Sequence, residues 1–126
     1  MQFVHYIREK NESGSHPTGT ITVLVDEEGA VAEVGFSLLH PNDQFVKKVG
    51  RNKAFGRGKG WFNMGIKSLP IGKIPTDREF DLITEMNKFV GKILVKHPDA
   101  QTPKWYQQMF DNTEEDVEEE VVVQLT

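Results

Sequence analysis

Alternation of apolar and polar positions is the first regularity of this sequence. In residues 1–9, Phe3, His5 and Ile7 alternate with Val4, Tyr6 and Arg8, and this period of two predicts a β-strand. Residues 21–25 and 31–39 repeat this period on both sides of a turn at residues 26–29, and the pattern predicts a β-hairpin. Residues 10–19 are rich in Ser, Gly and Pro and are predicted to form the loop before it.

Helical periodicity is strongest in residues 77–95, where apolar residues recur three and four positions apart. Thr76 and Glu79 have the spacing of a capping box at the start of this helix. A short helix is predicted at residues 103–110, and residues 121–125 have the composition of a last strand.

A second amphipathic helix is predicted at residues 43–55. Phe45, Val46 and Val49 lie on one side of it and its cations lie on two other sides. The glycine-rich residues 56–60 are predicted to end this helix in a loop, because each glycine weakens a helix by up to about 1 kcal/mol relative to alanine.

These elements predict an α+β fold. We expect an antiparallel sheet with an N-terminal hairpin, packed by the long helix at residues 77–95, with the shorter basic helix at residues 43–55 beside the end of the sheet. A length of 126 residues fits one domain, which we assign to residues 1–126, with an acidic segment at residues 111–120. No apolar run approaches 18 residues and the start is unlike a signal peptide, so we expect no membrane partner and a cytoplasmic location.

Charge is distributed unevenly along the chain. Lys and Arg number 15 against 19 Asp and Glu, which gives a net charge of -4, yet six of the 15 cations fall within residues 47–59. Residues 111–120 contain seven acids. The overall charge argues against general coating of nucleic acid, whereas a local anion-binding site needs only a few cations in one place.

Catalytic and metal-binding patterns are missing from the sequence. The chain has no cysteine, and its four histidines are scattered without the spacing of metal ligands. The glycines near Arg57 lack the spacing of a phosphate-binding P-loop, and Trp61 stands where Ser or Thr would follow. We therefore expect a protein that is not an enzyme and uses no cofactor and no metal.

The basic segment has the residue types of a nucleotide pocket: arginines for phosphate, backbone N–H groups in a glycine-rich turn, and aromatic rings for stacking. Two other interpretations stay open, namely a solvated basic face beside core aromatics, and a basic helix that docks the acidic tail of a neighbouring subunit or of its own chain. The candidate ligand-binding residues are Lys47, Lys48, Arg51, Arg57, Trp61 and Phe62.

One motif within residues 40–57 resembles a recurring pattern of small phage proteins. Its residues are Pro41, Asp43, Phe45, Lys47, Lys48, Gly50, Arg51, Gly56 and Arg57. The pattern is similar to that of the Thoeris anti-defence sponges, which bind cyclic ADP-ribose-type immune signals without cleaving them. The resemblance implies a homo-oligomer with ligand pockets between subunits, arginines on the pyrophosphate and aromatic rings on the base, and it carries over to Arg51 and Arg57.

The sequence therefore predicts a non-enzymatic, phage-type protein that sequesters a small phosphorylated nucleotide signal in the host cytoplasm. Two alternatives remain. One is a phage inhibitor of a host enzyme that acts through protein–protein contact, with the acidic tail mimicking nucleic acid. The other is a weak nucleic-acid-binding protein that uses the basic helix, whose binding would depend steeply on salt.

Overall fold

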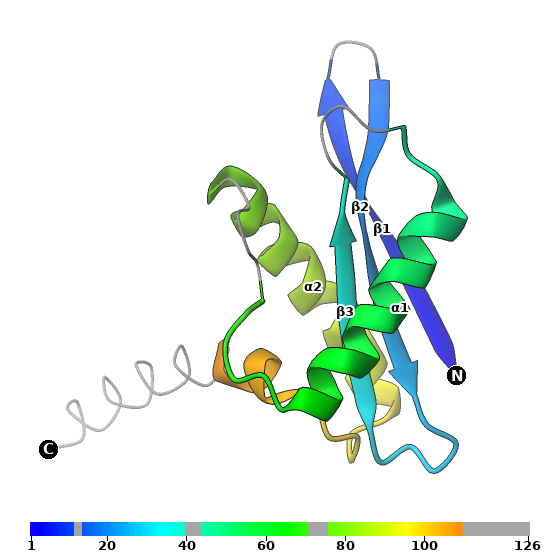
Figure 1. Cartoon of the computed structure of the whole chain (residues 1–126), viewed down its shortest axis with the longest axis vertical. Coiled ribbons are helices and arrows are strands. Elements are labelled where there is room, and N and C mark those ends of the chain that lie inside the picture. Colours follow the sequence, from blue (N-terminus) through cyan, green and yellow to red (C-terminus); the bar gives the residue numbers. More distant parts are fainter. Residues whose placement is uncertain (12–13, 40–43, 71–75, 110–126) are drawn as a thin grey trace, which may run out of the picture.

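The computed structural model describes residues 1–11, 14–39, 44–70 and 76–109, apart from the side chains of residues 10–11 and 76–81. Within this part the chain forms a three-stranded antiparallel sheet in the order β1-β2-β3, with two long helices and a helical segment at residues 104–109 (Figure 1). The α+β prediction is confirmed. The elements are β1 (Gln2–Asn11), β2 (Gly14–Val25), β3 (Ala32–Leu38), α1 (Lys47–Met64) and α2 (Thr76–Lys96).

The first hairpin is longer than predicted. β1 pairs with β2 as far as Asn11 opposite Gly14, so most of the predicted loop at residues 10–19 is strand, and that prediction is wrong. The register shifts between Ile7, which pairs with Gly19, and Arg8, which pairs with Pro17 of β2. A shift of this kind leaves room for a proline, which has no N–H to give to the ladder.

The second hairpin has its turn where it was predicted, at residues 26–29. The Asp26 carboxylate accepts hydrogen bonds from the backbone N–H groups of Ala30 at 2.8 Å and Val31 at 3.2 Å. Gly29 has φ 70°, in the left-handed region that a residue without Cβ occupies at little cost. These two hydrogen bonds and the conformation of Gly29 stabilise the turn between β2 and β3.

The two helices cover opposite faces of the sheet. Side chains alternate along a strand, so Thr20 of β2 points to one face and Ile21 points to the other. Gly50 of α1 lies against Thr20, whereas Leu82 of α2 belongs to the same apolar cluster as Ile21. α1 therefore crosses the face of the sheet, as Figure 1 shows, and the prediction that placed it beside the sheet's end is wrong.

Large apolar side chains fill the α2 side of the sheet. α2 begins and ends within one residue of its predicted bounds, and the segment at 104–109 confirms the short helix predicted there. The capping box of Thr76 and Glu79, the acidic segment and the predicted last strand lie outside the described side chains and residues. The buried cluster consists of Ile7, Ile21, Val23, Val25, Ala32, Val34, Phe36, Leu82, Met86, Val90, Ile93, Trp105 and Tyr106.

Candidate functional site

α1 lies so close to the sheet that its buried positions are occupied by small residues. Ala54 and Gly58 are buried, and an added Cβ at Gly58 would come within 3.0 Å of the backbone nitrogen of Gly35 in β3. An added Cβ at Gly50 would come within 2.6 Å of the Thr20 hydroxyl. Because these residues recur every four positions, they form one stripe along the helix, and backbone packs against backbone there.

The prediction that the glycines at residues 56–60 end the helix in a loop is wrong. The predicted helix ended at residue 55, but α1 continues to Met64 and ends at Gly65, whose φ of 63° forms a left-handed cap. The predicted apolar side is also wrong, because Val46 is 50% and Val49 is 47% exposed. The small-residue stripe, and not the valines, faces the sheet.

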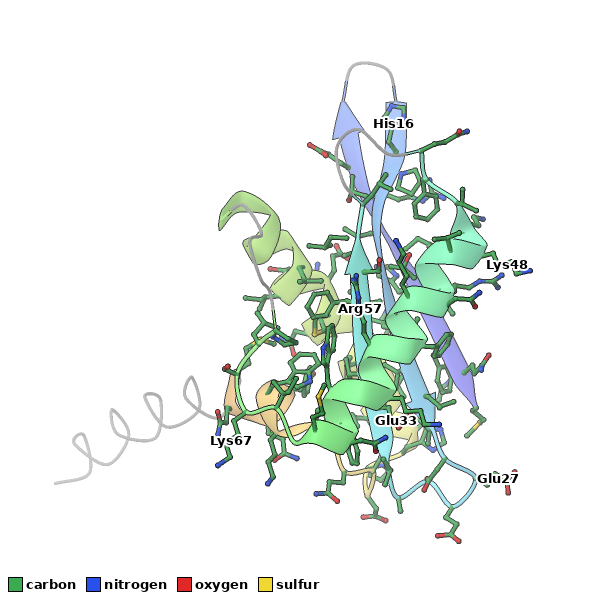
Figure 2. All side chains as sticks on the ribbon, in the orientation of Figure 1. His16, Glu27, Glu33, Lys48, Arg57 and Lys67 are labelled. Carbon is green, nitrogen blue, oxygen red and sulfur yellow. The ribbon has the colours of Figure 1, made fainter. Side chains whose placement is uncertain are left out.

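All six cations of α1 are exposed, and Figure 2 shows Lys48 and Arg57 pointing to different sides of the helix. On the β1 side the Lys47 ammonium lies 5.2 Å from the centre of the Tyr6 ring. On the β3 side Arg57 donates a long hydrogen bond of 3.5 Å to the backbone carbonyl of Phe36. At 100° per residue Arg51 and Arg57 are about 120° apart with the buried stripe between them. A single chain does not bring these two arginines together.

Positive charge on α1 has little compensation among the described residues. The helix contains no acid, and the ion pair recorded in the described part of the chain joins His5 to Glu85, away from α1. The charge of Lys59 affects the pKa of one acid, Glu33 of β3. Burial raises the pKa of the Glu33 carboxyl, the positive charge of Lys59 partly offsets this, and Asp26 adds to the increase. We call Lys47, Lys48, Arg51, Lys53, Arg57 and Lys59 the cationic surface.

The two aromatic candidates lie differently from the cations. The Trp61 ring is half-buried and packs against Phe36 at 4.9 Å and Trp105 at 5.9 Å between ring centroids. Trp61 therefore belongs to the packing around the core, where it contacts two other aromatic rings. Phe62 is half-buried, and its backbone carbonyl accepts a hydrogen bond from Gly65 at the helix end.

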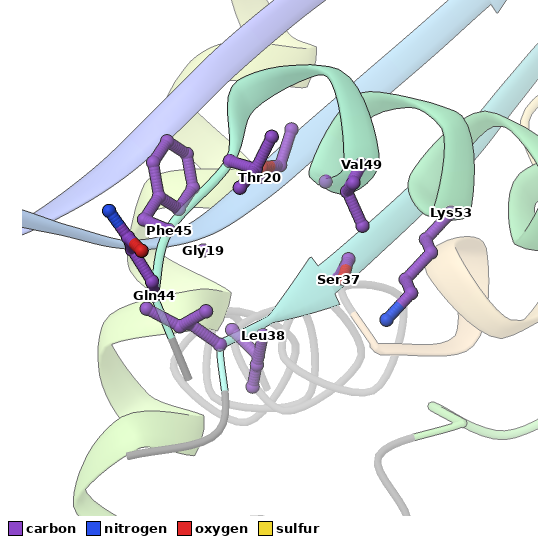
Figure 3. Close-up of a pocket in the computed structure, with 11 residues that line it drawn as sticks. Gly19, Thr20, Ser37, Leu38, Gln44, Phe45, Val49 and Lys53 are labelled. Carbon is purple, nitrogen blue, oxygen red and sulfur yellow. The ribbon is translucent and has the colours of Figure 1, made fainter. Parts of the chain in front are cut away.

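A pocket of about 270 Å³ opens between the beginning of α1 and the end of β3 (Figure 3). Lys53 and Ser37 lie on one side of it, and Gln44 and Phe45 lie on the other. The pocket thus combines a cation, an amide, a hydroxyl and an aromatic ring. The lining residues are Gly19, Thr20, Ser37, Leu38, Leu39, Gln44, Phe45, Val46, Val49, Gly50 and Lys53.

Sequence reasoning missed this pocket because its walls come from β2, from the end of β3 and from the first turns of α1, which only folding brings together. None of the predicted ligand-binding residues lines it. The signal that could have indicated it is Lys53, which the helical wheel already separates from Lys47 and Arg51. Of the phage motif, Pro41 and Asp43 lie outside the described residues.

Comparisons with known proteins were made at three levels. No protein-family model, no curated protein and no solved structure matches this chain. Within the described residues, no helix has the length and apolar character needed to cross a membrane. The same part of the chain contains no group of three or more His, Cys, Asp or Glu side chains arranged to hold a metal ion.

Proposed function

We propose that this protein is a non-enzymatic binding protein whose cationic surface holds the phosphates of a nucleotide ligand. The observation that carries the proposal is the exposure of six cations on one acid-free helix, with no ion pair recorded for them in the described part of the chain. Hydrogen bonds from charged donors to phosphate are roughly twice as strong as neutral ones. Arginine adds bidentate geometry at Arg51 and Arg57.

Residues 1–110 hold all 15 cations and 12 of the 19 acids, so this part of the chain has a net charge of +3. The negative total comes from residues 111–120, which contain seven acids and no cation. The overall charge of -4 therefore understates the attraction of α1 for an anion. Charges farther apart than about 8 Å are largely screened at physiological salt, so the local charge decides what α1 binds.

For a cyclic ADP-ribose-type signal, the proposed sponge role requires a second copy of the chain. Arg51 and Arg57 lie on opposite sides of α1. A pyrophosphate that binds both residues would therefore bind Arg51 of one subunit and Arg57 of another. The pocket beside Lys53 offers the Phe45 ring for a base and the Lys53 ammonium for a phosphate. The first point supports a homo-oligomer that encloses a small ligand between subunits, and the second supplies contacts to that ligand from a single chain.

A second candidate is nucleic-acid binding, which the length of the cationic surface favours. α1 has 18 residues and is therefore about 27 Å long. One strand of DNA carries one phosphate charge per about 3.4 Å, so a single strand that lies along α1 contacts cations at both ends of the helix. This candidate needs no second subunit.

One titration separates the candidates. Cyclic ADP-ribose and a fluorescein-labelled single-stranded 20-nucleotide DNA are each titrated into the full chain at 50 and 200 mM NaCl. The nucleotide proposal predicts saturable binding of cyclic ADP-ribose, with one nucleotide bound per subunit interface in native mass spectrometry, and loss of binding in both Arg51→Ala and Arg57→Ala at unchanged melting temperature. Binding of DNA alone, weakened about tenfold or more at the higher salt, supports the second candidate. No binding of either probe contradicts the proposed function.

A further inference from the structure

We infer that the acidic segment at residues 111–120 docks onto the cationic surface of its own chain and competes there with external phosphate. The first observation is the separation of charge along the sequence. Seven of these ten residues are acids, whereas six of the thirteen residues at 47–59 are cations. Opposite charges at such density attract each other over several ångströms even in water.

The second observation is that the described part of the chain does not neutralise α1. Among the described residues, Glu33 is the acid whose pKa a cation of α1 lowers, and that cation is Lys59. Lys48 and Arg51 are exposed, and neither forms an ion pair with another residue of the described part of the chain. Within the described residues, Lys48, Arg51 and Lys53 of the cationic surface therefore form no ion pair, and a run of carboxylates fits their charge.

The third observation is that the acidic segment is long enough to extend along α1. Trp105 of the 104–109 segment packs against Trp61 in the last turns of α1, so the described chain ends beside that helix. An extended chain spans about 3.3 Å per residue, so the eleven residues from 109 to 120 cover about 36 Å. This exceeds the length of about 27 Å that 18 residues of helix occupy. The segment is thus long enough to run along the whole length of α1 without a second subunit.

Docking within one chain has a consequence for binding. A segment tethered by a short linker has an effective concentration in the millimolar range. A weak intrinsic contact is then sufficient to occupy the cationic surface for much of the time and to lower its apparent affinity for external anions. This consequence rests on the proposed function, whereas the contact itself does not.

The contact is tested by NMR on the full chain, using the amide signals of α1 and the Nε–H signals of Arg51 and Arg57 at 25 mM NaCl. A tail variant neutralises four acids, and a control variant neutralises four exposed acids elsewhere. The tail substitutions are Glu115→Gln, Asp116→Asn, Glu118→Gln and Glu119→Gln. The control substitutions are Glu9→Gln, Glu27→Gln, Glu28→Gln and Asp99→Asn.

We expect the tail variant to shift the α1 signals, the control variant to leave them in place, and 500 mM NaCl to remove the difference between the tail variant and the wild type. Unmoved α1 signals in the tail variant, or equal shifts on α2, would overturn the inference. Shifts that disappear on dilution would also overturn it, because they would assign the contact to another copy of the chain.

Competition is measured with the labelled 20-nucleotide DNA and with cyclic ADP-ribose at 50 mM NaCl. The tail variant should bind whichever probe the protein binds about tenfold more tightly, and the control variant less than twofold more tightly. Equal gains in the two variants would overturn the competition. If the α1 signals shift but no probe binds either variant, the proposed function fails while the docked segment stands.

Discussion

The two faces of the sheet are covered in different ways. On the α2 face, Leu82, Met86 and Val90 are fully buried in a cluster of large apolar side chains. On the α1 face, Ala54 and Gly58 meet the strand backbone at Gly35. The first face is stabilised by the area removed from water, at roughly 25 cal/mol per Å². The second buries little side chain and depends on how closely two backbones approach each other.

This difference explains why α1 can expose so many cations. A helix whose contact residues are small needs no broad apolar stripe, so most of its circumference is available to polar side chains. The same closeness makes the contact intolerant of added atoms. The α2 face should therefore be sensitive to loss of volume and the α1 face to gain of volume.

The largest effect is expected from Gly35→Ala. The added Cβ would overlap the backbone carbonyl oxygen of Ala54 and come within 2.8 Å of the Gly58 nitrogen. Backbone atoms cannot rotate away, so we expect a loss of about 3 kcal/mol or more in the free energy of unfolding, measured by urea denaturation. Gly91→Ala in α2, where nothing lies within 4 Å of the added Cβ, is the control and should not destabilise. A Gly35→Ala protein of wild-type stability would refute the close contact.

Loss of volume is tested on the other face by Leu82→Ala. Leu82 is fully buried, and truncation of such a leucine leaves a cavity that costs about 2 to 5 kcal/mol. Val95→Ala, at a position 82% exposed on the same helix, should change stability by less than about 0.5 kcal/mol. Similar costs for the two substitutions would contradict the assignment of the α2 face.

Alkaline pH should weaken the α2 face. Burial raises the pKa of the Tyr106 phenol from 10.0 to about 12, because the low-polarity surroundings disfavour the phenolate. A folded pKa above the unfolded value means that this contribution is fully present below pH 10 and is lost as the pH rises towards 12. We expect a loss of up to about 2 kcal/mol across this window, measured by urea denaturation at several pH values. In Tyr106→Phe the additional pH dependence should disappear, and its persistence there would assign the effect to another group.

The smallest effects come from two glycines of α1 that lie two residues apart. Gly56 has nothing within 4 Å of an added Cβ, so Gly56→Ala should stabilise the helix by about 0.5 to 1 kcal/mol. Gly58→Ala places the Cβ 3.0 to 3.1 Å from three backbone atoms of β3 and should destabilise. Thermal denaturation, monitored by circular dichroism, shows whether each substitution raises or lowers the stability. The same sign for both would show that helix propensity, and not the sheet contact, governs these positions.

The α2 side could be predicted from sequence because large apolar residues at helical spacing reveal a buried face. α1 could not, because its buried stripe consists of Gly50, Ala54 and Gly58, which hydrophobicity does not mark. Propensity alone indicated that the helix ends at residue 55. The tertiary contact overrides the cost of Gly50 and Gly58, because a Cβ at these two positions would come too close to Thr20 and to the backbone of Gly35.

The candidate site was predictable in part. The helical wheel had already divided the cations between two sides, and the Tyr6 and Phe36 contacts of Lys47 and Arg57 place those sides towards β1 and β3. The burial of Trp61 among other rings and the pocket beside Lys53 depend on strands that only folding brings near α1. Spacing along the chain carries no information on such contacts.

The central claim, that α1 is the anion-binding element, is tested most directly by two charge-matched variants. Arg51→Gln with Arg57→Gln removes two positive charges from α1, and Lys88→Gln with Lys92→Gln removes two exposed charges from α2. Affinity is measured for cyclic ADP-ribose and for the labelled DNA at 50 mM NaCl, with melting temperature as the check on folding. The account predicts a loss of about tenfold or more for the α1 pair and less than about twofold for the α2 pair. Equal losses in the two variants would contradict it.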